Sequence, residues 1–161
     1  MSASDMQIRA ARTGDAAGIA ALLQAMGGFK AYENRTPAQN TEAVRTLLAG
    51  AEAAPERSLL LVAEDAQQRL IGYCAVHWLP VAVLQAWEGY VSELFVAGQA
   101  RGAGAGSLLL NAATEAARQR GCSRIWLVNN RERPSYVRGF YSQQGWAEQA
   151  EMARFVLPLN T

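Results

Sequence analysis

The chain has 161 residues, half of them apolar, which is enough for one hydrophobic core and typical of a single domain. Its 15 basic and 14 acidic residues nearly cancel, so charge gives no reason to expect nucleic acid or an anionic membrane surface as a partner. The N-terminus lacks the apolar run of a signal peptide, and no stretch approaches the roughly 18 apolar residues of a membrane span. We therefore expect a soluble, cytoplasmic protein with one domain over residues 1–161.

The first third of the chain predicts a strand followed by two helices. Residues 6–11 have the pattern of a short strand, and Thr13 and Asp15 are suited to cap a helix that ends at Gly27. Residues 29–35 are polar and aromatic without periodicity, which predicts an irregular connection. A second helix then starts at a capping box with a proline at its first position and carries an apolar stripe that we expect to be buried: Thr36, Pro37, Gln39, Val44, Leu47 and Leu48.

The middle of the chain predicts antiparallel strands. Residues 58–64 and 69–78 are apolar runs joined by a short polar turn, as in a hairpin. A third strand, residues 89–97, leads into the glycine cluster RGAGAGS at residues 101–107. This order places the glycine cluster directly after a strand.

The last part of the chain predicts a helix, a strand, a short helix and a final strand. Residues 107–121 have helical spacing of apolar residues and end at a glycine. Residues 123–130 suit a buried strand, residues 134–145 a short helix, and residues 152–159 a last strand. The order of elements predicts an α/β layered domain with a mixed sheet.

Cysteine and histidine usage argues against a metal site. Cys74 and Cys122 lie in apolar, strand-like runs, which favours reduced core thiols over a disulfide or metal ligands. The chain has one histidine, His77, so a His-rich metal centre is not expected.

The glycine cluster is suited to bind phosphate, although a simple hinge or turn is the alternative. The first N–H groups of the following helix have no intrahelical partner, and glycines let the backbone approach a ligand closely. Arg101 adds a positive charge at the start of the loop. The cluster lacks the G-K-[ST] ending of a P-loop, and Ser107 stands where a dinucleotide loop has its third glycine. Nucleotide hydrolysis and dinucleotide binding are therefore not expected.

Arg101, Gly104 and Gly106 form the pattern Arg-x-x-Gly-x-Gly, with ELFV before it and the pairs Phe140-Tyr141 and Gly145-Trp146 after it. This combination resembles the GNAT superfamily of acetyl-CoA-dependent N-acetyltransferases, and the order of elements agrees over nearly the whole chain. The resemblance implies a mixed, mostly antiparallel central sheet flanked by helices in a single layered domain. It also implies acetyl-CoA as co-substrate, no metal, and a homodimer.

The resemblance assigns the cofactor to the loop and to the strand before it. Backbone N–H groups would cradle the coenzyme A pyrophosphate, and the main chain of the preceding strand would bind the pantetheine arm. Many family members also have an asparagine seven residues before the catalytic tyrosine, where this chain has Pro134; Asn130, Arg131 or Arg133 could replace it. The expected cofactor-binding residues are Leu94, Phe95, Val96, Arg101, Gly102, Ala103, Gly104, Ala105, Gly106, Ser107 and Asn130.

Two residues are the candidates for proton transfer. Tyr141 matches the general acid of the family, and its alternative role is packing in the core. Glu93 is a candidate base for the acceptor amine, acting through water; alternatively, it only attracts a cationic substrate or points into solvent.

The acceptor is expected to be the primary amine of a small molecule, polyamine-like, amino acid-like or aminoglycoside-like. Residues 89–96 and 121–128 are similar to those of diamine acetyltransferases, which have an acidic pair where this chain has Ser92-Glu93. A silent acyl-CoA-binding domain and a protein N-terminal or lysine acetyltransferase are the alternatives. Ordinary packing is the favoured interpretation for each residue taken singly. The candidate acceptor-binding residues are Phe29, Tyr32, Glu33, His77, Trp78 and Trp87.

Overall fold

The computed structural model describes residues 5–159, so the first four and last two residues of the single domain expected over 1–161 lie outside the described part. The chain divides into two compact units, one ending at Val128 and the other beginning at Asn129. Each unit is described by itself.

The first unit is built on a five-stranded sheet in which the strands lie side by side in chain order. Neighbouring strands run antiparallel, except that the last two run parallel. The mixed, mostly antiparallel sheet predicted from the sequence is therefore confirmed. Its strands are β1 (Gln7–Ala10), β2 (Ser58–Glu64), β3 (Leu70–Val81), β4 (Ala86–Val96) and β5 (Arg124–Leu127).

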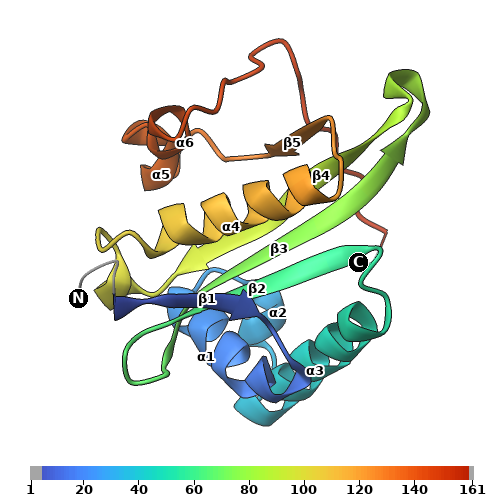
Figure 1. The fold of residues 1–161 in the computed structure, drawn as a ribbon. Helices are drawn as coiled ribbons and strands as arrows, with labels where there is room; N and C mark the ends of the chain where they lie inside the picture. The colour runs from blue at the N-terminus through green and yellow to red at the C-terminus, as the bar shows by residue number, and fades with distance from the viewer. Residues whose placement is uncertain (1–4, 160–161) are drawn as a thin grey trace. The chain divides into compact units, whose positions relative to one another are not determined.

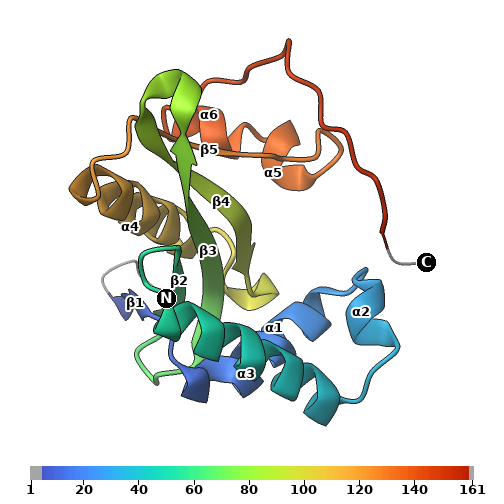
Figure 2. The ribbon, with the colours of Figure 1, turned by 90° about the vertical axis from the view of Figure 1, so that its right-hand side faces the viewer.

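Helices cover both faces of this sheet. Figures 1 and 2 show α4 (Ala105–Gln119) on one face and α1 (Ala16–Met26) with α3 (Pro37–Ala53) on the other. The α4 helix approaches β3 closely at Gly72, where an added Cβ would lie 2.8 Å from the Leu109 side chain. The largest fully buried side chains come from both helical layers and from the sheet, and they include Ile19, Leu48, Val62, Ile71, Val76, Leu109 and Leu110.

The ends of the first helices follow local chemistry, with one difference from expectation. The capping box of α3 is present. The Thr36 hydroxyl accepts from the Gln39 backbone N–H at 3.2 Å, and the Gln39 side-chain oxygen accepts from the Thr36 backbone N–H at 2.9 Å. Asp15 does not cap α1 through its side chain. Its carboxylate instead accepts from the Arg9 guanidinium at 2.8 Å, and residues 13–15 form the 3-10 turn η2 (Thr13–Asp15). Both carboxylate oxygens of Asp15 accept from Arg9, and neither accepts a backbone N–H of α1 as an N-cap would.

Two expectations about the α1–α3 layer are corrected. Residues 29–35, expected to be irregular, contain a short helix, α2 (Lys30–Glu33), held by the Tyr32 and Glu33 N–H groups donating to the Phe29 carbonyl. Leu47, placed in the buried stripe of α3, is 69% exposed, whereas Val44 and Leu48 are buried as predicted. The stripe that faces the sheet is narrower than the apolar pattern suggests.

The second unit contains two short helices, α5 (Pro134–Val137) and α6 (Phe140–Gln143). A single helix was expected over residues 134–145, but Gly139 adopts φ 68° and separates the two. The strand expected over residues 152–159 is wrong: these residues form no strand, and the side chains of Phe155, Leu157 and Leu159 are more than 80% exposed. A strand needs a neighbour to receive its backbone hydrogen bonds, and no strand pairing is present here.

None of the helices in the described residues is long and apolar enough to cross a membrane. Cys74 and Cys122 are both free thiols, as the sequence suggested; Cys74 is buried and Cys122 is half-buried. Burial raises the pKa of the Cys74 thiol to about 12, so it stays protonated at neutral pH.

Candidate active site

The strand β4 loses one neighbour halfway along its length. Its parallel pairing with β5 runs from Glu88 to Val91, opposite residues 124–127. Its antiparallel pairing with β3 continues to Val96. Within the described residues, the segment 92–96 therefore has an edge without a β5 partner, and its main chain can pair with a ligand as an added strand would. Leu94, Phe95 and Val96 lie on this edge.

The glycine loop follows directly and leads through η4 (Gly98–Ala100) into α4. Gly102 has φ 79° and Gly104, the N-cap of α4, has φ 97°, both in the region that favours glycine. No heavy atom lies within 4 Å of a Cβ added at Gly102. The Arg101 Nε donates to the Val96 carbonyl at 3.4 Å, which joins the loop to the end of β4.

Residues 102–107 thus bend around the start of a 15-residue helix, where Ala103, Ala105, Gly106 and Ser107 also lie. The first N–H groups of a helix lack intrahelical acceptors and carry a partial positive charge. Together with the open edge of β4, this geometry fits a ligand with a pyrophosphate at one end and an extended amide-containing arm, which is the chemistry of coenzyme A.

A β-bulge shapes β4 where its pairing with β5 ends. Val91 pairs with Val76 and Glu93 pairs with Ala75, so Ser92 is an extra residue. Regular alternation would turn Ser92 and Glu93 to opposite faces of the sheet. The Ser92 Oγ hydrogen-bonds the His77 ring, and Glu93 lines the same cavity as His77. The bulge therefore brings both side chains to the face covered by α1 and α3.

A cavity of about 250 Å³ lies on this face, between the sheet and α3. Its wall from α3 is apolar, whereas the sheet contributes Ser58, Tyr73, His77 and Glu93. The Tyr73 hydroxyl donates to the Glu93 carboxylate, and burial, followed by the charge of Glu93, raises the pKa of Tyr73 well above its usual range. The residues that line the cavity are Leu47, Gly50, Ala51, Ala54, Arg57, Ser58, Leu60, Tyr73, Ala75, His77 and Glu93.

A second cavity of about 260 Å³ is lined by the end of α1 and by α2, and it includes Phe29, Tyr32 and Glu33. The Phe29 ring packs edge-on against Phe95 of β4, with centroids 5.5 Å apart, and lies 6.2 Å from the Tyr32 ring. Burial, followed by the charge of Glu93, raises the pKa of Tyr32. The structure thus brings Phe29 and Tyr32 together with β4 near Glu93.

A row of side chains crosses the sheet beside Glu93. His77 of β3 pairs with Tyr90 of β4, which pairs with Trp126 of β5. The Tyr90 and Trp126 rings stack with centroids 4.3 Å apart, and the His77 ring lies 6.2 Å from Tyr90. The His77 Nε2 lies 2.7 Å from the Ser92 Oγ. Tyr90, Ser92 and Trp126 were not predicted as site residues, and the strand register that aligns them is not visible in the sequence.

Glu88 holds the parallel pairing of β4 and β5 in place. Its buried carboxylate accepts a hydrogen bond from the Arg124 guanidinium and a second, at 3.2 Å, from the Trp126 indole N–H. Arg124 is the residue paired with Glu88 in the ladder. This contact ties the two strands together at the start of their pairing, at the opposite end from the point where they part after Val91.

Trp78 and Trp87 do not lie beside Glu93. The Arg120 guanidinium, just past the end of α4, lies 5.3 Å from the centre of the Trp78 ring and 5.5 Å from that of Trp87. Both rings therefore lie on the α4 face, opposite to Glu93. This geometry gives neither tryptophan a role beside Phe29, Tyr32 and His77.

The second unit carries Tyr141 and the two asparagines. The Tyr141 ring packs edge-on against Phe140 at 5.0 Å and near Trp146 at 6.3 Å. The Asn130 side chain accepts from the Glu132 backbone N–H at 2.9 Å, which is a local turn contact. The neighbouring Asn129 accepts from Ser135 at 3.3 Å, and its Nδ2 is the only buried side-chain N or O atom in residues 5–159 that has no hydrogen-bond partner.

Comparison with known proteins agrees with this geometry. A family model described as the acetyltransferase (GNAT) family matches residues 17–146. The uncharacterized N-acetyltransferase YhfO of Bacillus subtilis (strain 168) is 30% identical over 152 residues, which cover 94% of this chain and 97% of YhfO.

Solved structures share the fold. A transcriptional regulator from Bacillus halodurans C-125 is 26% identical with a TM-score of 0.76, covering 94% of this chain and 99% of that protein. Glucosamine-6-phosphate N-acetyltransferase from Arabidopsis thaliana is 16% identical with a TM-score of 0.75, covering 93% and 97% of the two chains, and shows likeness of fold alone. With a family match that spans most of its length, the protein belongs to the acetyltransferase (GNAT) family and is an N-acetyltransferase that uses acetyl-CoA as co-substrate.

Proposed function

We propose that the protein acetylates the primary amine of a small molecule, by direct attack of the amine on acetyl-CoA while both are bound. The observation that carries this proposal is the position of Glu93. Its carboxylate lies at the point where β4 parts from β5, and it faces a cavity whose other walls are mainly apolar. A lone carboxylate in such a cavity attracts an ammonium group.

Acetyl-CoA would lie along the open edge of β4 and over the start of α4. In this proposal the main chain of residues 94–96 binds the pantetheine arm, and the N–H groups of residues 102–107 bind the pyrophosphate, with Arg101 adding charge. The unpartnered Asn129 amide supports Asn129 rather than Asn130 as the asparagine that donates to the cofactor. Acetyl-CoA itself supplies the activated thioester.

The acceptor would bind on the face of the sheet that α1 and α3 cover. Phe29 and Tyr32 border one side of its site, and His77 with Glu93 borders the other. In this proposal Tyr141 protonates the thiolate that leaves, and residues 1–161 act as one catalytic domain. The cavity volume of about 250 Å³ supports a compact acceptor rather than a folded protein.

We further propose that the protein is a homodimer. The exposed apolar side chains of Phe155, Val156, Leu157 and Leu159 support this, because apolar surface of this kind is costly to leave in water. Analytical ultracentrifugation at micromolar concentration tests it, and a monomer would contradict it.

The deciding experiment measures thiol release from acetyl-CoA with a panel of primary amines: polyamines, amino acids, aminoglycosides and a lysine-containing peptide. We expect turnover with at least one small amine and none with the peptide. Acetyl-CoA binding without turnover on any amine would instead indicate a silent acyl-CoA-binding domain. Turnover on the peptide alone would indicate a protein acetyltransferase.

A further inference from the structure

A hydrogen bond joins the imidazole of His77 to the hydroxyl of Ser92. His77 is the single histidine of the chain, it lies on β3, and its Nε2 is 2.7 Å from the Oγ of Ser92. Ser92 is the extra residue of the β4 bulge. Without the bulge, β4 would offer no hydroxyl beside the imidazole.

His77 lines the cavity that Glu93 also lines, and its ring connects this cavity to the Ser92 hydroxyl. Ser92 is exposed and adjoins Glu93 in the chain, so its hydroxyl is open to a ligand from outside the cavity. The same residues mark the end of the β4–β5 pairing, next to the edge proposed for the thioester. The pair thus lies between the two proposed substrates.

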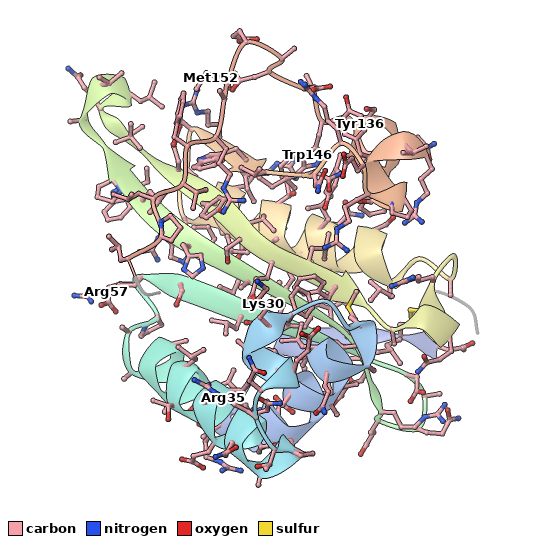
Figure 3. The ribbon with its side chains drawn as sticks, turned by 180° about the vertical axis from the view of Figure 1, so that it is seen from behind. Lys30, Arg35, Arg57, Tyr136, Trp146 and Met152 are labelled. Atoms are coloured by element: carbon pink, nitrogen blue, oxygen red, sulfur yellow. The ribbon has the colours of Figure 1, made fainter. Side chains whose placement is uncertain are left out.

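The groups around His77 leave its imidazole available as a base. Glu93 and Tyr90 face it from β4, and Tyr73 lines the same cavity from β3. The wall from α3 carries no charge, since it consists of Leu47, Gly50, Ala51 and Ala54. Arg57 lies at the start of β2, but its side chain is 83% exposed, and Figure 3 shows it turned outward.

We propose that His77 accepts the proton of the acceptor ammonium through the Ser92 hydroxyl, while Glu93 holds the ammonium in place. This inference rests on the proposed amine acetyltransferase activity and assigns the base within it. Neutral His77 carries its proton on Nδ1; Ser92 Oγ–H donates to Nε2, and an N–H of the ammonium donates to Oγ. Transfer along this chain leaves a neutral amine, an intact serine and an imidazolium.

The proton balance of the whole reaction is complete. The ammonium begins with three N–H protons, and the amide product keeps one. One proton passes to His77 and then to water. The second leaves nitrogen after the C–N bond forms and the C–S bond breaks, and it ends on the coenzyme A thiol. No further reactant is needed.

Glu93 is the less suitable base of the two. Its carboxylate already accepts the Tyr73 hydroxyl, whereas the His77 Nε2 contacts the Ser92 hydroxyl, which can relay a proton. A role for Glu93 in binding predicts an effect on KM, whereas a role for His77 in proton transfer predicts an effect on the pH profile.

The test is the pH dependence of kcat/KM, from pH 5.5 to 10, with one good amine. For the wild-type enzyme we expect kcat/KM to fall at the acidic end of this range, because a base that already carries a proton cannot accept another. His77→Gln keeps a hydrogen-bonding group near Ser92 but cannot accept a proton. We expect this variant to lose about 10²-fold or more at pH 7 and to recover tenfold per pH unit as the amine deprotonates by itself.

Ser92 provides a matched pair of variants. Ser92→Ala removes the relay and should reproduce the profile of His77→Gln, whereas Ser92→Thr retains the hydroxyl and should restore most of the lost rate. Glu93→Gln should raise KM for the amine, while the fall in kcat/KM at the acidic end of the pH range remains. Thermal unfolding and acetyl-CoA binding, measured on each variant, show that it is folded.

Three results would overturn the inference. The first is a folded His77→Gln enzyme with the wild-type pH profile, and the second is Ser92→Ala and Ser92→Thr enzymes of equal rate. The third is a Glu93→Gln enzyme that, alone among the variants, no longer loses kcat/KM at acidic pH. If the wild-type enzyme releases no thiol with any amine, the proposed function fails instead. The two failures are therefore distinguishable.

Discussion

Replacing Gly102 with alanine tests the proposed cofactor cradle directly. Gly102 has φ 79° and open space where a Cβ would be built, so the free protein can accept the methyl group without a clash. Holding alanine in this left-handed region costs about 1–2 kcal/mol of folding free energy. The same methyl group would stand on the surface that the pyrophosphate is proposed to approach.

Gly121 provides a matched control. It follows the end of α4, has φ 77°, and also has no heavy atom within 4 Å of an added Cβ. Gly121→Ala and Gly102→Ala should therefore lose similar stability, which corresponds to a fall in Tm of about 2–8 °C for a domain of this size. They should differ in cofactor affinity. We expect Gly102→Ala to raise the Kd for acetyl-CoA about tenfold or more, equivalent to roughly 1.4 kcal/mol, and Gly121→Ala to leave it unchanged.

Isothermal titration calorimetry of both variants with acetyl-CoA, together with thermal unfolding, separates strain from blocked binding. Equal Kd values for wild-type and Gly102→Ala would refute the cradle. An equal loss of affinity in both variants would show that strain in the backbone, and not contact with the phosphates, causes the effect.

Three further predictions concern other parts of the chain. Tyr141→Phe keeps the ring that packs against Phe140 but removes the proton, so kcat should fall about 10²- to 10⁴-fold with little change in acetyl-CoA Kd, and steady-state kinetics would reveal an unaltered kcat if the assignment is mistaken. Glu88→Ala leaves Arg124 and the Trp126 indole without their acceptor and should lower the free energy of unfolding by about 1–3 kcal/mol in urea titrations, with a smaller loss for Glu88→Gln, and equal losses would contradict this. The Arg9 hydrogen bond lowers the pKa of Asp15, so its stabilisation is present above about pH 4 and is lost as pH falls through the lowered pKa; the difference in urea midpoint between wild type and Asp15→Asn should shrink from pH 7 to pH 3, and a constant difference would oppose it.

The elements that depend on local patterns could be predicted from the sequence. The helix expected over residues 107–121 is present as α4 (Ala105–Gln119), with Gly121 at φ 77° just beyond its C-cap, because apolar spacing and a terminal glycine act within one turn of the chain. The hairpin of β2 and β3 was likewise predictable from two apolar runs and the polar turn between them. The phosphate-binding interpretation of the loop has the same local origin.

The features that depend on distant neighbours could not be predicted. Alternation along β4 placed Ser92 and Glu93 on opposite faces, and only the register against β3 shows that they share one. Trp87 was grouped with His77 by residue type, although the two lie on opposite faces of the sheet. Residues 152–159 have the composition of a strand, but composition does not supply the partner that a strand requires.

The single strand β4 is proposed to serve the two substrates through different parts of its structure. Its edge would recognise acetyl-CoA through N–H and C=O groups, which every residue except proline carries, whereas its face would recognise the acceptor through the side chains of Glu93 and its neighbours. Substitutions on this face of β4 can therefore change which acceptor binds without lowering the affinity for acetyl-CoA. A relative with 30% identity can then share the cofactor and the fold and still have diverged in what it acetylates, so acceptors must be determined chain by chain.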